Sequence, residues 1–252
     1  ALAQGFHLVG ITSAAPSAHF PYYQKWIAQG YFGEMLYLKR HEEKKRDPKH
    51  LLPDARSIIC CALSYKTSFQ NPSRDINGKA IISNYAWGDD YHDIMWKKLE
   101  KLLLSMKNLI PNLEGKVYCD TGPVLERSFA QHAGIGWIGK NSCVIHPQYG
   151  SYLFLGEILV NIDLEYDEQK TDHCGSCSRC IDACPTQALL EPYQLDATRC
   201  ISYLTIEKKE SFSIEEKKMI GNHLYGCDIC QQACPWNDKA LTPDLDYFKP
   251  RS

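Results

Sequence analysis

The chain lacks long apolar runs, a strong net charge and any visible signal peptide. It has 28 Lys and Arg against 30 Asp and Glu in 252 residues. No apolar run approaches the ~20 residues that a membrane-spanning helix requires, so the sequence argues against a membrane protein. The near-neutral balance also argues against a protein that coats nucleic acid through one broad basic surface. We therefore expect a cytoplasmic protein, a monomer, that uses no membrane.

Cysteine, by contrast, is abundant, with twelve residues in the chain. Eight of them form two arrays, Cys174-x2-Cys177-x2-Cys180-x3-Cys184-Pro185 and, after Cys200, Cys227-x2-Cys230-x3-Cys234-Pro235. Closely spaced thiolates suit one face of a 4Fe-4S cube, and a Cys before Pro ligates the neighbouring cube. Two cubes need eight ligands, so the arrays predict two 4Fe-4S clusters.

The crossing rule divides the eight thiolates into two sets. The first set is Cys174, Cys177, Cys180 and Cys234. The second set is Cys184, Cys200, Cys227 and Cys230. Zinc knuckles and disulfides are the alternatives, because Cys-x2-Cys pairs also bind zinc. The third Cys at the same spacing and the Pro that ends both arrays favour the cubes. The unassigned Cys60, Cys61, Cys119 and Cys143 are expected in the core.

A change in composition near residue 166 predicts two domains. Alternating apolar residues over 152–162 give way there to an acidic, polar stretch. We expect a catalytic domain at 1–165 and a ferredoxin-like domain at 166–252, with a helical insertion of about two helices at 196–226. β-branched and apolar content predicts strands at 8–12, 57–64, 116–120 and 152–162. Helical periodicity appears at 21–29, 91–107 and 124–133. This alternation predicts a layered α/β or α+β domain.

Two short motifs resemble well-known sites. The run Gly134-Ile135-Gly136-Trp137-Ile138-Gly139 matches the dinucleotide fingerprint. However, that fingerprint needs a strand before it and a helix after it, and here a predicted helix comes first. A loop that approaches another large cofactor fits better.

The second motif, Asp120-Thr121-Gly122, imitates the aspartic protease triplet, but the chain has no second copy. Asp, Gly and the following Pro123 also suit a plain turn. Alternatively, Asp120 closes a strand and faces the start of a helix, where a partly desolvated carboxyl beside a planar cofactor could donate a proton.

Several segments together give the chain a specific resemblance. They are Asp120-Thr121-Gly122-Pro123-Val124-Leu125-Glu126-Arg127, Gly134 to Asn141, Tyr85-Ala86-Trp87-Gly88-Asp89-Asp90-Tyr91-His92, and the two cysteine arrays in this order. Over nearly its whole length the chain resembles the epoxyqueuosine reductases. The resemblance implies reduction of the epoxide of epoxyqueuosine to the alkene of queuosine, in tRNA with a GUN anticodon, as the last step of queuosine synthesis.

The resemblance also implies a cofactor, a fold and a catalytic residue. The cofactor is cobalamin, cycled between cob(II)alamin and cob(I)alamin by the clusters. The fold is α+β, with a nitroreductase-like cobalamin domain followed by the two-cluster module, as in reductive dehalogenases. Asp120 matches the family's proton donor. A flavodoxin or ferredoxin is expected as the electron donor.

Contacts to the cofactor and to tRNA are predicted less directly. An Asp-x-His-x-x-Gly cobalt-binding motif begins at Asp90 but has Met95 in place of Gly, so we expect no His ligand, and His92 as a surface or core residue. The residues expected to bind cobalamin are Arg46, Tyr85, Asp120, Gly139, Lys140, Asn141, Ser142, Val144, Leu155 and Ser202. Asn and Ser near turns also commonly cap backbone groups.

Lys208 and Lys209 are candidate tRNA contacts, although mixed charge runs are usually solvated helix faces. Two other functions remain open: a dehalogenase-like enzyme acting on a small molecule, and a plain electron carrier. Cobalamin binding and tRNA dependence distinguish the three.

Overall fold

An antiparallel four-stranded sheet forms the centre of the computed structural model, which describes residues 1–69 and 79–251. Its strand order is β1-β2-β7-β4, with bounds Leu8–Ser13, Ser57–Ser64, Leu153–Val160 and Gly115–Tyr118. All three pairings are antiparallel. Strand β2 lies inside the sheet and is buried at every position, which explains its uninterrupted apolar sequence.

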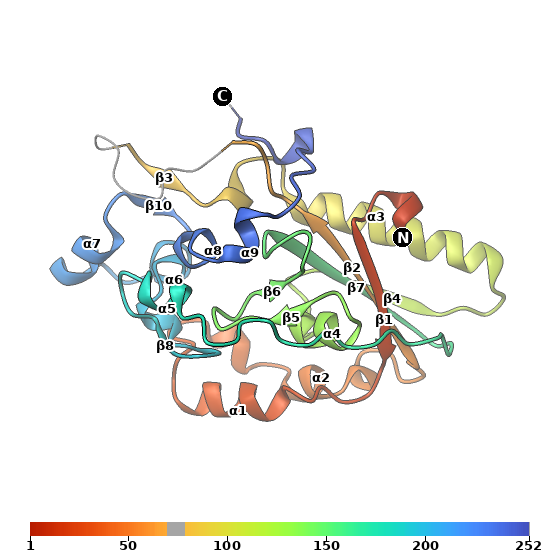
Figure 1. Ribbon diagram of the computed structural model, residues 1–252. Coiled ribbons are helices and arrows are strands. Elements are labelled where there is room, and N and C mark those ends of the chain that lie inside the picture. Colours follow the sequence, from red (N-terminus) through yellow and green to blue (C-terminus); the bar gives the residue numbers. More distant parts are fainter. Residues whose placement is uncertain (70–78, 252) are drawn as a thin grey trace.

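Helices cover both faces of this sheet (Figure 1). The long helix α3, Tyr91–Leu109, packs Met95, Leu99 and Leu103 into the core on one face. On the other face, α4, Glu126–His132, buries Phe129 and Ala130 against the sheet. Helices α1, Phe20–Ala28, and α2, Glu42–Arg46, lie beyond α4. The result is a helix–sheet–helix sandwich with an apolar core on each side of the sheet.

The remaining elements are short. Strands β5, Trp137–Ile138, and β6, Val144–Ile145, form a hairpin after α4. The cysteine-rich part contains α5 (Arg179–Asp182), β8 (Leu189–Glu191), β9 (Gln194–Leu195), α6 (Ile201–Ile206), α7 (Ile214–Ile220), β10 (His223–Tyr225), α8 (Ile229–Gln232) and α9 (Pro235–Asp238). 3-10 helices span Leu2–Gln4, Leu36–Lys39, Pro48–His50, Asn84–Ala86, Ala197–Arg199 and Asp246–Phe248.

The cysteine-rich part is joined to the sandwich at several places. Strand β10 pairs in parallel with β3, Ile81–Ile82, which lies between β2 and α3 in the sequence. Phe248, near the end of the chain, is buried in the core beneath α3. Cys234 packs against Trp137 and Ile145 of the β5–β6 hairpin.

The predicted strands and helices of the sandwich are confirmed, with one informative difference at the end of β4. The strand ends at Tyr118 rather than at residue 120, because Asp120 has a left-handed φ of 57° that a strand cannot accommodate. The sheet is also antiparallel, so the rule that parallel α/β sheets present catalytic groups at strand ends does not apply. The turn between β4 and α4 places Asp120 instead.

The order of elements around the glycine motif is also confirmed. Helix α4 ends before Gly134, whose φ of 71° is left-handed, and β5 follows. Gly136 is needed because an added Cβ would lie 2.2 Å from the carbonyl oxygen of Ile145 in the facing strand. The motif therefore forms a tight helix-to-hairpin connection and does not have the dinucleotide-binding arrangement.

Among the described residues, no helix combines the length and apolar character needed to cross a bilayer.

Candidate active site and cluster sites

Asp120 lies in the tight turn between β4 and α4. Its left-handed backbone is one that Asp and Asn tolerate better than most residues. The Asp120 N–H donates to Glu126 Oε1 at 2.5 Å. Gly122 leaves space for the Tyr118 ring, which an added Cβ would approach to 2.4 Å. The Asp120 side chain is 59% exposed, so an accessible carboxyl projects from a main chain that is held in place.

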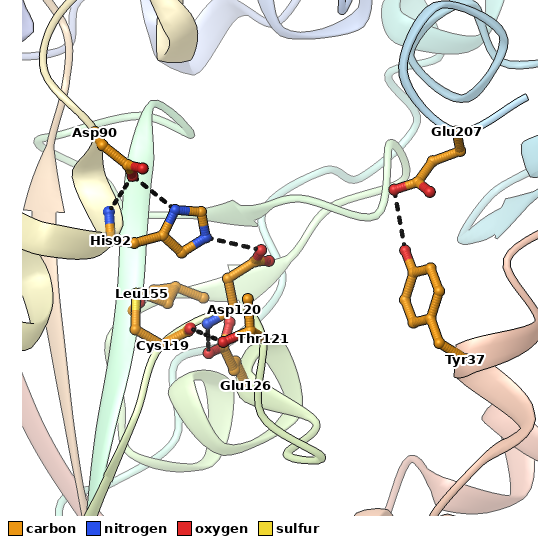
Figure 2. Close-up of polar contacts among 9 residues, drawn as sticks. All are labelled: Tyr37, Asp90, His92, Cys119, Asp120, Thr121, Glu126, Leu155 and Glu207. Carbon is orange, nitrogen blue, oxygen red and sulfur yellow. Dashed lines mark hydrogen bonds and ion pairs between the residues drawn. The ribbon is translucent and has the colours of Figure 1, made fainter.

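His92 connects Asp120 to a second carboxylate, Asp90. Asp90 caps α3 by accepting from the His92 N–H at 2.9 Å, and the same oxygen lies 2.7 Å from His92 Nδ1. His92 Nε2 lies 3.2 Å from Asp120 Oδ2 (Figure 2). Burial alone would lower the pKa of His92, but the two carboxylates outweigh it and raise the pKa above its ordinary value. A protonated His92 can donate from both nitrogens and can therefore supply a proton to Asp120.

The sequence predicts a surface or core histidine at position 92, and the structure places its partly exposed ring between two carboxylates. The Asp-x-His-x-x-Gly pattern concerns His92 only as a cobalt ligand. Its partner Asp120 is 28 positions away in the sequence, and only the packing of α3 against β4 and β7 brings the two together. One local signal is present: Asp90 stands two residues before His92, which is the spacing between a helix N-cap residue and the N–H that it accepts from.

Tyrosine rings line the region around Asp120. The Tyr91 ring stacks on His92 with centroids 4.0 Å apart, and Tyr85 lies edge-on to Tyr91 at 6.4 Å. Burial raises the pKa of both phenols, and the negative charge of Asp120 adds to the effect. The Tyr85 ring also lies near the Tyr225 ring of β10, with centroids 6.1 Å apart. The cysteine-rich part thus reaches the surroundings of Asp120.

Tyr37 and Glu207 lie across from Asp120 (Figure 2). The Tyr37 hydroxyl donates to Glu207 Oε1 at 3.1 Å. Burial, Glu207 and then Asp120 raise the pKa of Tyr37 to about 12. Neither residue carries a local sequence signal, because Tyr37 and Glu207 are 170 positions apart.

The first predicted cysteine set lies around one cavity. Cys174, Cys177, Cys180 and Cys234 all line it, together with Lys140, His173 and Trp236. Lys140 Nζ donates to the carbonyls of Gly175 and Cys177 at 2.6 and 2.9 Å, which fixes the loop between the first two cysteines. The structure therefore gathers three cysteines of the first array with one of the second.

The second predicted set is also gathered. The Cys230 and Cys227 thiols are close enough to Cys200 and Cys184 to interact electrostatically. The backbone N–H of Ala188 donates to Cys184 Sγ at 3.2 Å. Burial would raise the pKa of Cys184, but hydrogen bonds from Thr186, Ala188 and Leu189 outweigh it and lower the pKa. These donors favour a thiolate at Cys184, the form that binds metal.

The residues around the first cavity fit an anionic cluster. Trp137 is fully buried, and its indole N–H has no acceptor among the described residues that meets hydrogen-bond geometry. The Cys174 thiol is the group within its reach. A thiol is a weak acceptor, whereas a cluster-bound thiolate is a strong one, so a cluster would satisfy this otherwise costly buried donor.

The same cysteines do not have the arrangement of the alternative sites. All twelve cysteines are free of disulfides. Within residues 1–69 and 79–251, no three His, Cys, Asp or Glu side chains converge as a single metal ion would require.

The predicted cobalamin residues fall into several places. Gly139, Lys140, Asn141 and Ser142 form the β5–β6 turn between the two cysteine sets, with Asn141 Nδ2 3.5 Å from the Cys230 carbonyl. Val144 and Leu155 belong to the core cluster under α4. Tyr85 lies among the rings near Asp120. Ser202 is on α6. Arg46 is on α2, where it pairs with Glu43 at 2.9 Å.

The donor set near Asp120 suits a large ligand that carries carboxamides. The Tyr85 phenol and the exposed Asp120 carboxyl offer polar groups to such a ligand. The Tyr91 ring is stacked between His92 and Phe154, with centroids 4.0 and 4.1 Å away, so both of its faces are already covered. His92, by contrast, uses both ring nitrogens on carboxylates.

The two candidate tRNA contacts differ in how far their side chains are exposed to solvent. Lys208 pairs with Glu216 at 2.6 Å, and its side chain is only 14% exposed. Lys209 is exposed, and its backbone N–H donates to Glu34 at 3.0 Å. Lys208 therefore mainly joins α6 to α7.

A mixed sandwich that carries an acidic turn, next to two groups of four cysteines, defines an iron–sulfur oxidoreductase. Residues 173–237 match the 4Fe-4S double cluster binding domain, and residues 45–121 match the family Epoxyqueuosine reductase QueG, DUF1730. The chain belongs to the epoxyqueuosine reductase family. The prediction of this family and of a mixed α+β fold with a double-cluster domain is thus confirmed.

Known relatives support the assignment. The epoxyqueuosine reductase of Synechocystis is 44% identical over 90% of this chain and 78% of its own length. That of Pseudomonas aeruginosa is 40% identical over 98% of this chain and 69% of its own. A crystal structure of an epoxyqueuosine reductase with an epoxyqueuosine-modified tRNA stem loop superposes with a TM-score of 0.89 at 37% identity, over 99% of this chain and 66% of that one. A reductive dehalogenase at 14% identity shares the fold, with a TM-score of 0.55 over 92% of this chain and 30% of that one.

Proposed function

We propose that this protein reduces the epoxide of epoxyqueuosine to the alkene of queuosine at the wobble position of tRNA with a GUN anticodon. Family membership supports this substrate, as does the relative solved with an epoxyqueuosine-modified stem loop. The observation that carries the proposal is the exposed Asp120 carboxyl, which has a second acid–base group, His92, 3.2 Å behind it.

The reaction consumes two electrons and two protons and releases water. Breaking the epoxide carbon–oxygen bond develops negative charge on oxygen, and a protonated Asp120 neutralises that charge. A second proton and loss of water complete the alkene. His92 restores the proton on Asp120, and Asp90 keeps the imidazole oriented toward Asp120.

Cobalamin, when bound beside Asp120, would supply the electrons at the epoxide carbon. Tyr85 and the β5–β6 turn residues Gly139, Lys140, Asn141 and Ser142 would contact the cofactor. The two cysteine sets would hold 4Fe-4S clusters that pass single electrons from a flavodoxin or ferredoxin.

Anaerobic reconstitution tests the proposal. The protein is loaded with iron, sulfide and cobalamin, reduced, and incubated with tRNA that carries epoxyqueuosine, and the nucleosides are read by mass spectrometry. Loss of one oxygen to give queuosine supports the function. If cobalamin binds but the tRNA is unchanged, a dehalogenase-like activity is favoured; if cobalamin does not bind, an electron carrier is favoured.

Substituting His92 with Gln should lower kcat about tenfold near neutral pH, because a hydrogen bond to a charged group is lost. In the unsubstituted enzyme, kcat should fall as pH rises through the raised pKa of His92, since the imidazolium is then lost. His92→Gln should remove this alkaline limb. The measurement is single-turnover rate against pH.

His50→Gln is the matched control for this prediction, because His50 is an exposed partner of Glu43 away from Asp120. It should leave the pH profile unchanged. An alkaline limb that persists in His92→Gln would assign that limb to another group.

A further inference from the structure

Glu157 is a buried acid beneath the Asp120 turn. It lies on β7 opposite Cys60 of β2 and Tyr118 of β4, and it is completely inaccessible to solvent. Alternation along β7 places Glu157 on the same face as Leu155 and Leu159, the face covered by α4. An acid in such a position is costly unless it is paired or neutral.

No ordinary donor satisfies Glu157. Among the described residues, neither of its carboxyl oxygens receives a hydrogen bond. The titratable and charged groups that face the pair from the packed elements are Cys60 of β2, Tyr118 of β4, Tyr91 of α3, Cys119 and Asp120 of the turn, and Arg127 of α4. Arg127 is the cation of this set, and it is exposed and donates to the Ser142 carbonyl.

The adjacent carboxyl of Glu126 supplies the missing partner. Two carboxyls in contact can bond only if one is protonated, because ionised carboxyls are acceptors only. Burial and the charge of Glu126 raise the pKa of Glu157 well above its ordinary value. Burial raises the pKa of Glu126 to about 7, while the bond from Glu157 opposes that rise. One proton shared between the two carboxyls would satisfy both.

Glu126 links this pair to the proposed acid. One of its oxygens, Oε1, accepts from the Asp120 N–H, and this bond holds a residue whose backbone is left-handed. We propose that Glu157 and Glu126 share one buried proton and act as positioning residues, holding the main chain of Asp120 so that its carboxyl meets the substrate. This inference rests on the proposed function for its catalytic half, while the shared proton stands independently.

Two substitutions of Glu157 separate the proton from the hydrogen bond. In Glu157→Gln the amide N–H still donates to Glu126, but position 157 no longer titrates. In Glu157→Met the side chain keeps a similar length and loses the donor. Glu165→Gln, at an exposed position, is the matched control.

The first readout is thermal stability against pH, which does not depend on turnover. Because folding raises the carboxyl pKa values, their contribution to stability is complete below the ordinary value of 4.5 and is lost as pH rises through about 7 and beyond. The Tm of the unsubstituted protein should therefore fall relative to Glu157→Gln as pH increases from about 5 to 8. An infrared band from a protonated buried carboxyl should also vanish in Glu157→Gln.

The second readout is steady-state kinetics with protein loaded with both clusters and cobalamin. Glu157→Gln should keep most of kcat, whereas Glu157→Met should lose about tenfold in kcat with KM unchanged. If Glu157→Gln and Glu165→Gln change the pH dependence of Tm equally, the shared proton is refuted. Full kcat in Glu157→Met refutes the positioning role. If the unsubstituted protein reduces no epoxyqueuosine, the proposed function and the positioning role fall together, and the Tm series still decides the proton.

Discussion

Asp120→Asn should lower the turnover of epoxyqueuosine by about 10²- to 10⁴-fold, the range that a general acid contributes. Asn has the same shape and tolerates the left-handed backbone at this position. It keeps a polar contact with His92 but cannot donate an acidic proton to the opening epoxide. The measurement is single-turnover conversion, with cobalamin and iron content determined on the same samples.

Two companion variants make this result specific. Asp93→Asn changes an exposed aspartate on the neighbouring α3 and should retain full turnover. Asp120→Ala should be as inactive as Asp120→Asn and also less stable, because Ala is strained at positive φ. Turnover by Asp120→Asn at the unsubstituted rate would remove Asp120 from the mechanism.

The second large effect is expected at the cysteine that crosses between arrays. Cys234→Ala should abolish turnover and remove the cluster at the Cys174 cavity, although Cys234 belongs to the other array. Iron content should fall from about eight to about four per chain. Cys143→Ala is the control, since Cys143 lies near the same thiols but belongs to neither set.

Double variants test the crossing directly. Cys174→Ala with Cys234→Ala should lose no more than either single variant, about four iron per chain, because both thiols serve one cluster. Cys174→Ala with Cys184→Ala should lose nearly all iron, because these two thiols serve different clusters when the arrays cross. If the two arrays instead bind their clusters separately, the two results should be reversed. Iron analysis and low-temperature EPR of the reduced proteins distinguish these outcomes.

Local sequence patterns predicted the sandwich well. The buried run of β2 and the helical spacing of Met95, Leu99 and Leu103 on α3 each reflect one element facing one core, so periodicity alone was sufficient. The helix-before-glycine order likewise excluded a dinucleotide site. The grouping of cysteines was also predicted from their spacing. In two-cluster ferredoxins the Cys that precedes Pro in each array ligates the cluster of the other array.

Residues that act through distant partners could not be predicted this way. The contacts of His92 with Asp120 and of Glu157 with Glu126 give no local signal, because the partners lie far apart in the sequence. Lys208 was a candidate for tRNA, but its pairing with Glu216 depends on how α6 meets α7. Each of these contacts depends on packing between elements.

The sequence by itself determined the family, the mixed fold, the two sets of cysteines and the acidic turn. These features depend on residues close together in the sequence, because a short stretch of chain limits which of its atoms can come into contact. Only the tertiary structure decided that Asp90, His92 and Asp120 form one chain of polar contacts and that Glu157 lies beneath it. The charge state of such groups depends on burial and on neighbours within a few ångströms, and both are set when the sheet and its helices close around them.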